Sequence, residues 1–150
     1  MTIEMAHQWS IDASPAEVWA VLADFEHLAD WAPGVSHSSA MTPVPPGVGA
    51  TRRVQAGRVT LVETITEWVP DRALAYELGG LPPMTGAASN RWMLAANGSG
   101  TDVTLTVRVE PRAKPLSKIA ARLVSRRIAG ANRELLAGLD AVFEARRADS

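Results

Sequence analysis

The chain has 150 residues, a formal net charge of -1 and a hydrophobic fraction of 47%. These values fit one folded domain over residues 1–150 and exclude a disordered chain. Because there is no basic excess, nucleic acid is not an expected partner. The chain has no cysteine, which excludes disulfides and thiol chemistry.

The start of the chain lacks the basic and then apolar run of a secretory signal. No stretch approaches the ~20 apolar residues that a membrane-spanning helix needs. We therefore expect a cytoplasmic protein without a membrane span.

A strand and two short helices are predicted at the N-terminal end. Residues 3–11 alternate between apolar and polar side chains, and this period of two is typical of a β-strand. Ser14 can cap a helix and Pro15 suits its first turn, so a helix should begin there. A second short helical segment would end before Pro33.

From residue 35 to residue 110 the pattern changes to strands separated by turns. Alternating or β-branched runs predict six strands, over 35–41, 49–55, 58–68, 72–78, 87–95 and 103–110. The segments 42–47 and 79–86 are rich in proline and glycine, and we expect them to be loops.

Beyond Pro115, apolar residues recur at helical spacing and predict one helix of about 30 residues. Its expected buried face comprises Leu116, Ile119, Leu123, Ile128, Ala131, Leu135, Leu139 and Val142. Seven antiparallel strands with one apolar face should curl, and only this helix is long enough to cover their concave side. The predicted fold class is therefore α+β, a helix-grip fold in which a curved seven-stranded antiparallel sheet surrounds a long C-terminal helix, with two short helices after the first strand. The gap left between sheet and helix would be a ligand cavity.

Three side chains on inward-facing strand positions are candidates for acid–base catalysis. His7 could act as a general base, Glu63 as a desolvated acid or base, and Tyr76 as a group that orients a ligand oxygen. Each has a structural alternative. His7 would be a hydrogen-bonded core residue, Glu63 would pair with Arg52 or Arg53 on the neighbouring strand, and Tyr76 would simply pack in the core.

Apolar, aromatic and amide side chains on the same faces would contact the ligand. These candidates are Trp9, Trp68, Leu74, Asn90, Trp92, Leu81, Met84, Leu123 and Ile128. The 79–86 loop would either close over the cavity as a lid hinged at its glycines or pack against the long helix. The three histidines lack metal-ligand spacing and there is no nucleotide-binding motif, so we expect neither a metal nor a cofactor.

Lys114, Lys118, Arg122 and Arg126 recur every four residues along the long helix. Such a basic stripe would suit docking to an acidic partner, such as an acyl carrier protein, or to an anionic surface. The alternative is an ordinary solvated helix face.

Several segments, taken in order, resemble the START-like, helix-grip (SRPBCC) superfamily, and within it the polyketide cyclase/dehydrase group. The resemblance spans nearly the whole chain and is carried by residues 11–19, 24–25, 31–34, 49–53, 63–65, 70–76 and 100–104. It implies an apolar tunnel between sheet and helix. It also implies relatives that include aromatase/cyclases, lipid and quinone carriers, hormone receptors and proteins that sequester toxic natural products.

Three functions are consistent with these observations. The first is binding of a small hydrophobic molecule, polyketide, aromatic or lipid-like, as a carrier or as a sequestering, self-resistance protein. The second is a polyketide cyclase, aromatase or dehydratase that works by shape-directed acid–base catalysis, which requires at least two polar groups converging in the cavity. The third is an interaction module that docks an acidic carrier protein. The sequence leaves the ligand and the oligomeric state open.

Overall fold

The computed structural model describes residues 1–43 and 45–150, so Val44 of the expected 42–47 loop lies outside the described residues. The strands are β1 (Ile3–Ile11), β2 (Val35–Ala40), β3 (Thr51–Ala56), β4 (Val59–Val69), β5 (Ala73–Gly79), β6 (Ala87–Asn97) and β7 (Gly100–Glu110). The α-helices are α1 (Pro15–Ala23) and α2 (Pro115–Ala148), and the 3-10 helices are η1 (Phe25–Asp30) and η2 (Pro83–Thr85). Within the described part of the chain, no helix is both long and apolar enough to cross a membrane.

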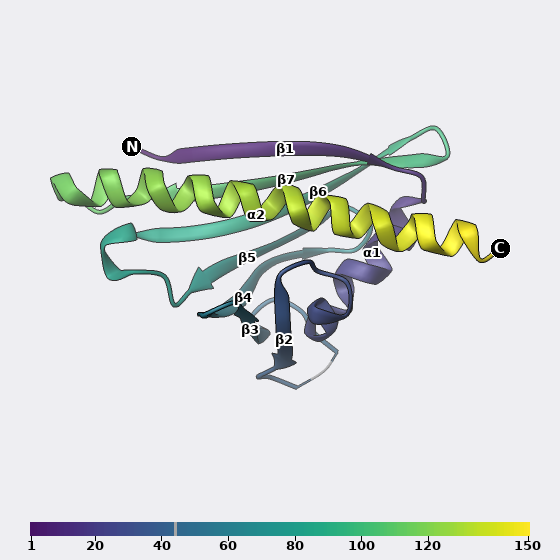
Figure 1. The fold of residues 1–150 in the computed structure, drawn as a ribbon, viewed down its shortest axis with the longest axis horizontal. Helices are drawn as coiled ribbons and strands as arrows, with labels where there is room; N and C mark the ends of the chain where they lie inside the picture. The colour runs from purple at the N-terminus through teal and green to yellow at the C-terminus, as the bar shows by residue number, and fades with distance from the viewer. Residues whose placement is uncertain (44) are drawn as a thin grey trace.

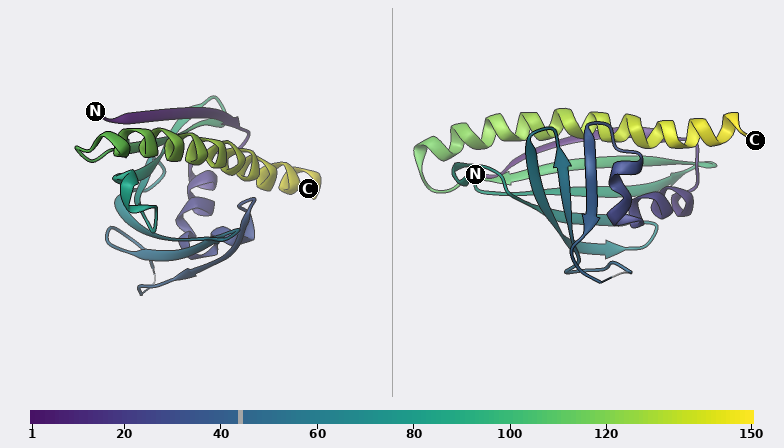
Figure 2. Two further views of the ribbon diagram at one scale, coloured as in Figure 1. Left: turned by 60° about the vertical axis from the view of Figure 1, so that its left-hand side comes forward. Right: turned by 60° about the horizontal axis from the view of Figure 1, so that its bottom comes forward.

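All seven strands form one antiparallel sheet in the order β1-β7-β6-β5-β4-β3-β2. The strands from β2 to β7 follow one another as a meander, whereas β1 pairs with β7, the last strand. The chain therefore crosses from one edge of the sheet to the other through α1 and η1. α2 runs along the sheet (Figure 1), and the sheet curls away from it toward β3 and β2 (Figure 2, left). The predicted helix-grip fold is confirmed.

The N-terminus of α1 is fixed by a capping box, as the sequence predicts. Ser14 Oγ accepts a hydrogen bond from the Glu17 backbone N–H at 3.2 Å, and Glu17 Oε1 accepts one from the Ser14 N–H at 3.2 Å. Thr101 Oγ1 on β7 donates to the Ala13 carbonyl at 2.7 Å. These bonds satisfy backbone groups at the helix start and fix the point at which the chain leaves β1.

The first half of α2 buries a different face from the one expected. Small side chains face the sheet there, at four-residue intervals: Ser117, Ala121, Ser125 and Ala129. Leu116, Ile119 and Leu123 are instead 65%, 57% and 59% exposed. The small residues allow the helix backbone to approach β1 and β7, which leaves no room for large side chains in between. The expected buried face is therefore wrong for this half and also at Ala131, which is exposed, while Leu139 farther along is fully buried.

Gly138 marks a second close approach, between α2 and the segment that follows η1. A Cβ at this position would lie 2.5 Å from Pro33 Cδ and 3.2 Å from the Trp31 carbonyl oxygen. Both distances are shorter than ordinary van der Waals contact. The helix can lie this close to residues 31–33 only because residue 138 has no side chain.

We predict opposite effects of alanine at the two glycines of α2. Gly138→Ala should lower the free energy of unfolding by about 1–3 kcal/mol because it overpacks the contact with Pro33. Gly130→Ala is the matched control, since its Cβ would meet nothing within 4 Å. It should raise stability by about 0.5–1 kcal/mol through helix propensity alone. Urea denaturation measures both changes, and shifts of the same sign would contradict the close approach.

Candidate functional site

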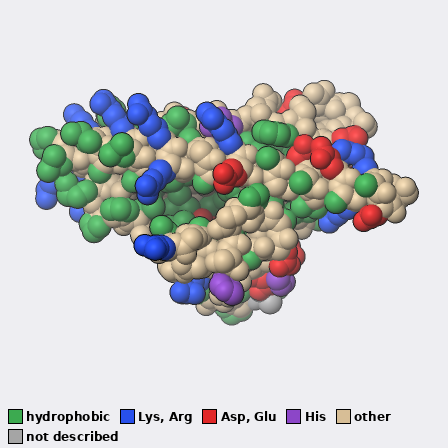
Figure 3. Space-filling model, viewed as in Figure 1, with side chains coloured by type: hydrophobic (Ala, Val, Ile, Leu, Met, Phe, Trp, Pro, Cys, Tyr) green, Lys and Arg blue, Asp and Glu red, His purple; other side chains and the backbone are tan. Residues whose placement is uncertain are grey.

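A cavity of about 210 Å³ lies between α2 and the curled part of the sheet. Figure 3 shows the molecule hollowed beneath α2. Most of the wall is apolar, and its large side chains include Val54, Leu61, Leu78, Leu81, Ile128 and Leu135. An apolar protein cavity of about 150 Å³ accommodates benzene. This cavity is therefore suited to an apolar molecule of about one or two fused rings.

Three polar side chains from neighbouring strands meet in the wall of this cavity. Glu63 on β4, Tyr76 on β5 and Asn90 on β6 all line it, and all three are buried. Tyr76 and Asn90 are direct cross-strand partners, and Glu63 is opposite Leu78, two residues from Tyr76. The pleat thus places three of the predicted site residues on one face.

Arg52 and Glu63 form a buried ion pair. The expected structural alternative for Glu63, pairing with an arginine of the neighbouring strand, is therefore confirmed. Arg52 Nε and Nη2 each lie 2.7 Å from Glu63 Oε1, and Arg52 Nη1 donates to the Phe25 carbonyl at 2.8 Å. Because both contacts end on Oε1, Oε2 can accept a hydrogen bond from a cavity occupant. Loss of either partner would leave an uncompensated buried charge, at a cost of about 3–5 kcal/mol.

The Tyr76 hydroxyl is held as a neutral hydrogen-bond donor. Trp92 Nε1 donates to its oxygen at 3.1 Å, so the hydroxyl still has its own hydrogen to donate. Burial, reinforced by the charge of Glu63, raises the pKa of Tyr76 to about 12. At neutral pH the phenol can therefore donate to a ligand oxygen and does not act as a base.

Asn90 is paired with a residue that sequence reasoning missed. Asn90 Nδ2 donates to Asn132 Oδ1 at 3.1 Å, and Asn132 Nδ2 donates to Asn90 Oδ1 at 2.9 Å. This reciprocal amide pair joins β6 to α2 at the cavity wall. The sequence shows Asn132 only as a polar residue among the apolar positions of the long helix, and its burial, at 1% exposure, is seen in the structure.

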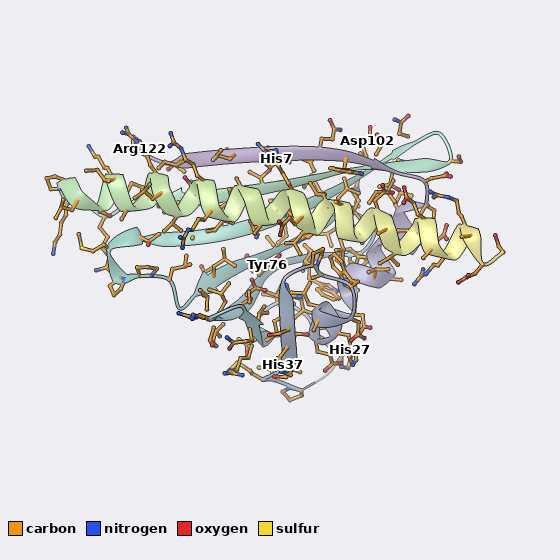
Figure 4. The ribbon with its side chains drawn as sticks, in the orientation of Figure 1. His7, His27, His37, Tyr76, Asp102 and Arg122 are labelled. Carbon is orange, nitrogen blue, oxygen red and sulfur yellow. The ribbon has the colours of Figure 1, made fainter. Side chains whose placement is uncertain are left out.

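Two predicted residues of β1 lie away from the cavity lining. His7 Nε2 is buried without a hydrogen-bond partner among the described residues. In Figure 4, His7 and Tyr76 lie on opposite sides of α2. Trp9 Nε1 donates to Asp140 Oδ2 at 3.1 Å and so fastens β1 to α2. The structure therefore does not bring His7 together with Glu63 and Tyr76.

Three other predicted ligand contacts, Trp68, Leu74 and Trp92, lie outside the lining of the cavity. Trp68 packs edge-on against Trp19, with ring centroids 5.0 Å apart, and Trp92 packs against Trp31 at 6.3 Å. Leu74 and Trp92 border a separate void of about 10 Å³, which is too small for a ligand. These side chains support the wall without contacting the space inside it.

The 79–86 loop packs against the long helix, which is one of its two expected roles, and it also contributes to the cavity wall. Leu81 lines the cavity, while η2 packs against α2. Met84 is 39% exposed and outside the lining, as is Leu123 on α2, whereas Ile128 lines the cavity. Gly86 has a φ of 88°, a conformation that favours glycine, so it sets the course of the loop into β6.

One group of side chains at η1 has the composition of a possible metal site. Its potential ligand atoms lie within 4.8 Å of one another and come from Asp24, Glu26 and His27. His27 Nδ1 lies 2.6 Å from Asp24 Oδ1, and this hydrogen bond raises the pKa of His27. Asp24 and His27 are both exposed, and we interpret them as a hydrogen-bonded pair on the surface.

We predict that Tyr76 titrates late and couples alkaline pH to unfolding. Its pKa is 10.0 when unperturbed and about 12 in the fold, so the stabilising contribution is complete below pH 10.0 and is lost as pH rises toward 12. Across that window the free energy of unfolding should fall by up to about 2 kcal/mol more than in Tyr76→Phe. Tyr76 is the only tyrosine, so phenolate absorbance reports it alone. A midpoint near pH 10 in the folded protein would contradict the prediction.

The matching family model is described as polyketide cyclase/dehydrase and lipid transport, and it covers residues 2–144. No curated protein is similar enough in sequence to count as a match. Among solved structures, the Zhui aromatase/cyclase from Streptomyces sp. R1128 is 20% identical with a TM-score of 0.79, over 97% of this chain and 96% of that one. The di-domain aromatase/cyclase BexL of the BE-7585A biosynthetic pathway is 21% identical with a TM-score of 0.76, over 95% of this chain and 50% of BexL.

A START superfamily protein from Mycobacterium smegmatis is 13% identical with a TM-score of 0.72, over 95% of this chain and 97% of that one. At these identities the structural likenesses concern the fold, whereas the family match extends over almost the whole sequence. The chain belongs to the polyketide cyclase/dehydrase and lipid transport family.

Proposed function

We propose that this protein binds a small aromatic or polyketide-like molecule in the cavity under α2 and orients it through one or two oxygen atoms. The observation that carries the proposal is the apolar cavity of about 210 Å³ with Glu63, Tyr76 and Asn90 in one wall. The function would be that of a carrier or of a sequestering protein.

The chemistry of the wall supports a ligand that carries a phenol, enol or ketone. The Tyr76 hydroxyl can donate to a carbonyl or phenolic oxygen, and Glu63 Oε2 can accept from a hydroxyl. A ligand with both kinds of oxygen would satisfy both groups. The apolar remainder of the cavity would hold a hydrocarbon or ring portion, since burial there needs no further polar partner.

We predict that 2-naphthol, a neutral bicyclic phenol, binds in this cavity. Ala131→Phe should abolish binding because Ala131 lines the cavity, and a phenyl ring would fill the space. Ala137→Phe is the matched control, at another exposed alanine of α2 outside the lining, and should bind normally. Isothermal titration calorimetry measures both affinities.

Tyr76→Phe should weaken 2-naphthol binding about 5-fold, the value of one neutral hydrogen bond. Naphthalene, which lacks the hydroxyl, should bind the parent and Tyr76→Phe equally. If Ala131→Phe bound 2-naphthol like the parent, the cavity would not be the binding site. Mass spectrometry of compounds extracted from the purified protein would then identify the natural ligand class.

A second candidate function is catalysis, favoured by the convergence of polar groups in the wall. A dehydratase or cyclase must remove a proton next to a ketone and then expel hydroxide or form a carbon–carbon bond. Glu63 would accept the proton, and Tyr76 would stabilise the enolate by donating its hydrogen bond. In a dehydratase, Glu63 would return the proton to the departing hydroxide, so that water leaves and the carboxylate is regenerated. The ion pair with Arg52 keeps the carboxylate in place for such a role.

If the protein is a dehydratase, it should accelerate loss of water from 4-hydroxy-4-phenylbutan-2-one, a β-hydroxy ketone of suitable size. The product is a conjugated enone that is followed by its near-ultraviolet absorbance. Tyr76→Phe should lower kcat about 10- to 100-fold with little change in KM, because its hydrogen bond strengthens in the transition state. A rate equal to that in buffer would remove this candidate and leave binding as the function.

A further inference from the structure

The exposed apolar residues of α2 form a ridge that is flanked by basic side chains. We define the α2 ridge as Leu116, Ile119 and Leu123, together with Lys118, Arg122 and Arg126. Each of its three apolar members is more than half exposed. At 100° per residue they are centred on the side of the helix opposite Ser117, Ala121 and Ser125, so they point directly away from the sheet.

Positive charge is concentrated around the N-terminal half of α2. Seven of the 15 basic residues lie within 111–133, which contains no Asp or Glu, although the whole chain has 16 acidic residues. All seven side chains are exposed, and among the described residues none of them forms an ion pair. The first turn of α2 also lacks an acidic residue, so the positive end of the helix dipole is not offset.

The space-filling view shows the two kinds of side chain together. In Figure 3, hydrophobic and basic side chains intermingle over the N-terminal end of α2. Exposed large apolar side chains in a row are costly in water, and unpaired cations gain nothing from one another. Neither feature contributes to the fold, because the buried face of this segment is made of Ser and Ala.

We propose that the α2 ridge docks on the surface of an anionic lipid bilayer. In such a complex the helix would lie in the plane of the interface, with Leu116, Ile119 and Leu123 inserted at the boundary of headgroups and acyl chains. Lys118, Arg122 and Arg126 would contact the lipid phosphates. This occupant accounts for the apolar centre and for the basic flanks of the ridge at once.

The other occupants fit less well. A second copy docking ridge to ridge would bring two sets of seven positive residues together, with no acidic residue in the segment to compensate them. An acidic protein, such as the acyl carrier protein of the sequence-based hypothesis, would satisfy the cations. It would leave unexplained three neighbouring large apolar side chains that are 57% to 65% exposed.

Docking through the ridge would leave the cavity on the side of α2 that faces away from the bilayer, about one helix diameter from it. Ile128, which lines the cavity, is five residues after Leu123, a distance of about 8 Å along the helix. The 79–86 loop, which supplies Leu81 to the cavity wall, packs against α2 as well. Exchange of a ligand between bilayer and cavity would rest on the proposed function, whereas docking itself does not.

Vesicle co-sedimentation tests the docking with the full chain. The protein should sediment with vesicles of phosphatidylcholine and phosphatidylglycerol and remain in solution with phosphatidylcholine alone. Leu116→Ser/Ile119→Ser/Leu123→Ser and Lys118→Glu/Arg122→Glu/Arg126→Glu should each lower the partition coefficient at least ~10-fold. Controls on the strands β3 and β4 and their adjoining turns should bind like the parent. They are Arg53→Glu/Arg58→Glu/Arg72→Glu, which changes the charge equally, and Val59→Ser/Val69→Ser, which replaces exposed apolar side chains.

Insertion of the ridge can be followed separately. Because the chain has no cysteine, Leu123→Cys can be labelled alone with an environment-sensitive nitrobenzoxadiazole dye. Its emission should shift to the blue and gain intensity on anionic vesicles, while the same dye on Val69→Cys should not change. Raising the salt from about 0.1 M to about 1 M should weaken binding, since the Debye length falls from about 10 Å to about 3 Å.

Two results would overturn the inference. One is that the parent sediments equally with anionic and with neutral vesicles, or that the ridge variants sediment with anionic vesicles as well as the parent does. The other is binding of a purified acyl carrier protein through the ridge without any binding to anionic vesicles. The ridge variants should still bind 2-naphthol, which shows that they are folded. A parent protein that binds 2-naphthol but not anionic vesicles would refute docking, whereas a parent that binds anionic vesicles but not 2-naphthol would refute only the proposed function.

Discussion

The arrangement of the cavity depends on one buried cation. The Arg52 guanidinium lies 3.7 Å from the centre of the Phe25 ring and 4.9 Å from that of Tyr76, while its N–H groups bind Glu63 and the Phe25 carbonyl. It therefore joins η1, β3, β4 and β5 in one contact set. A guanidinium with these partners is satisfied in the plane and on its faces, which makes a charged residue in the core tolerable.

Much of the fold follows from local patterns, and the exceptions have physical reasons. Strict alternation in residues 103–109 and the capping box around Ser14 predict the strand and helix that are observed. The face of the first half of α2 could not be predicted, because it is set by how closely the helix approaches β1 and β7. Periodicity identifies a helix and its apolar residues, but a face of Ser and Ala can be the buried one.

The cavity wall was predictable only in part. Glu63, Tyr76 and Asn90 could be placed on one side of the sheet because side chains alternate along a strand. Asn132 could not, since pairing between a strand and a helix distant in sequence depends on tertiary packing. The same limit applies to His7. Its place in the alternation along β1 puts the side chain on the inward face, but β1 is three strands away from β5, which carries Tyr76. The polar atoms of the wall are positioned by partners within the protein, so an incoming molecule would meet groups already oriented.

The clustering of basic residues within 111–133 gives the protein an uneven charge distribution despite a net charge of only -1. In Figure 3, basic side chains are frequent at the N-terminal end of α2 and acidic ones toward the other end. An external field exerts a torque on such a molecule even when the net force on it is small. Approach to a negatively charged surface would thus be preceded by rotation, with the start of α2 turned forward before contact.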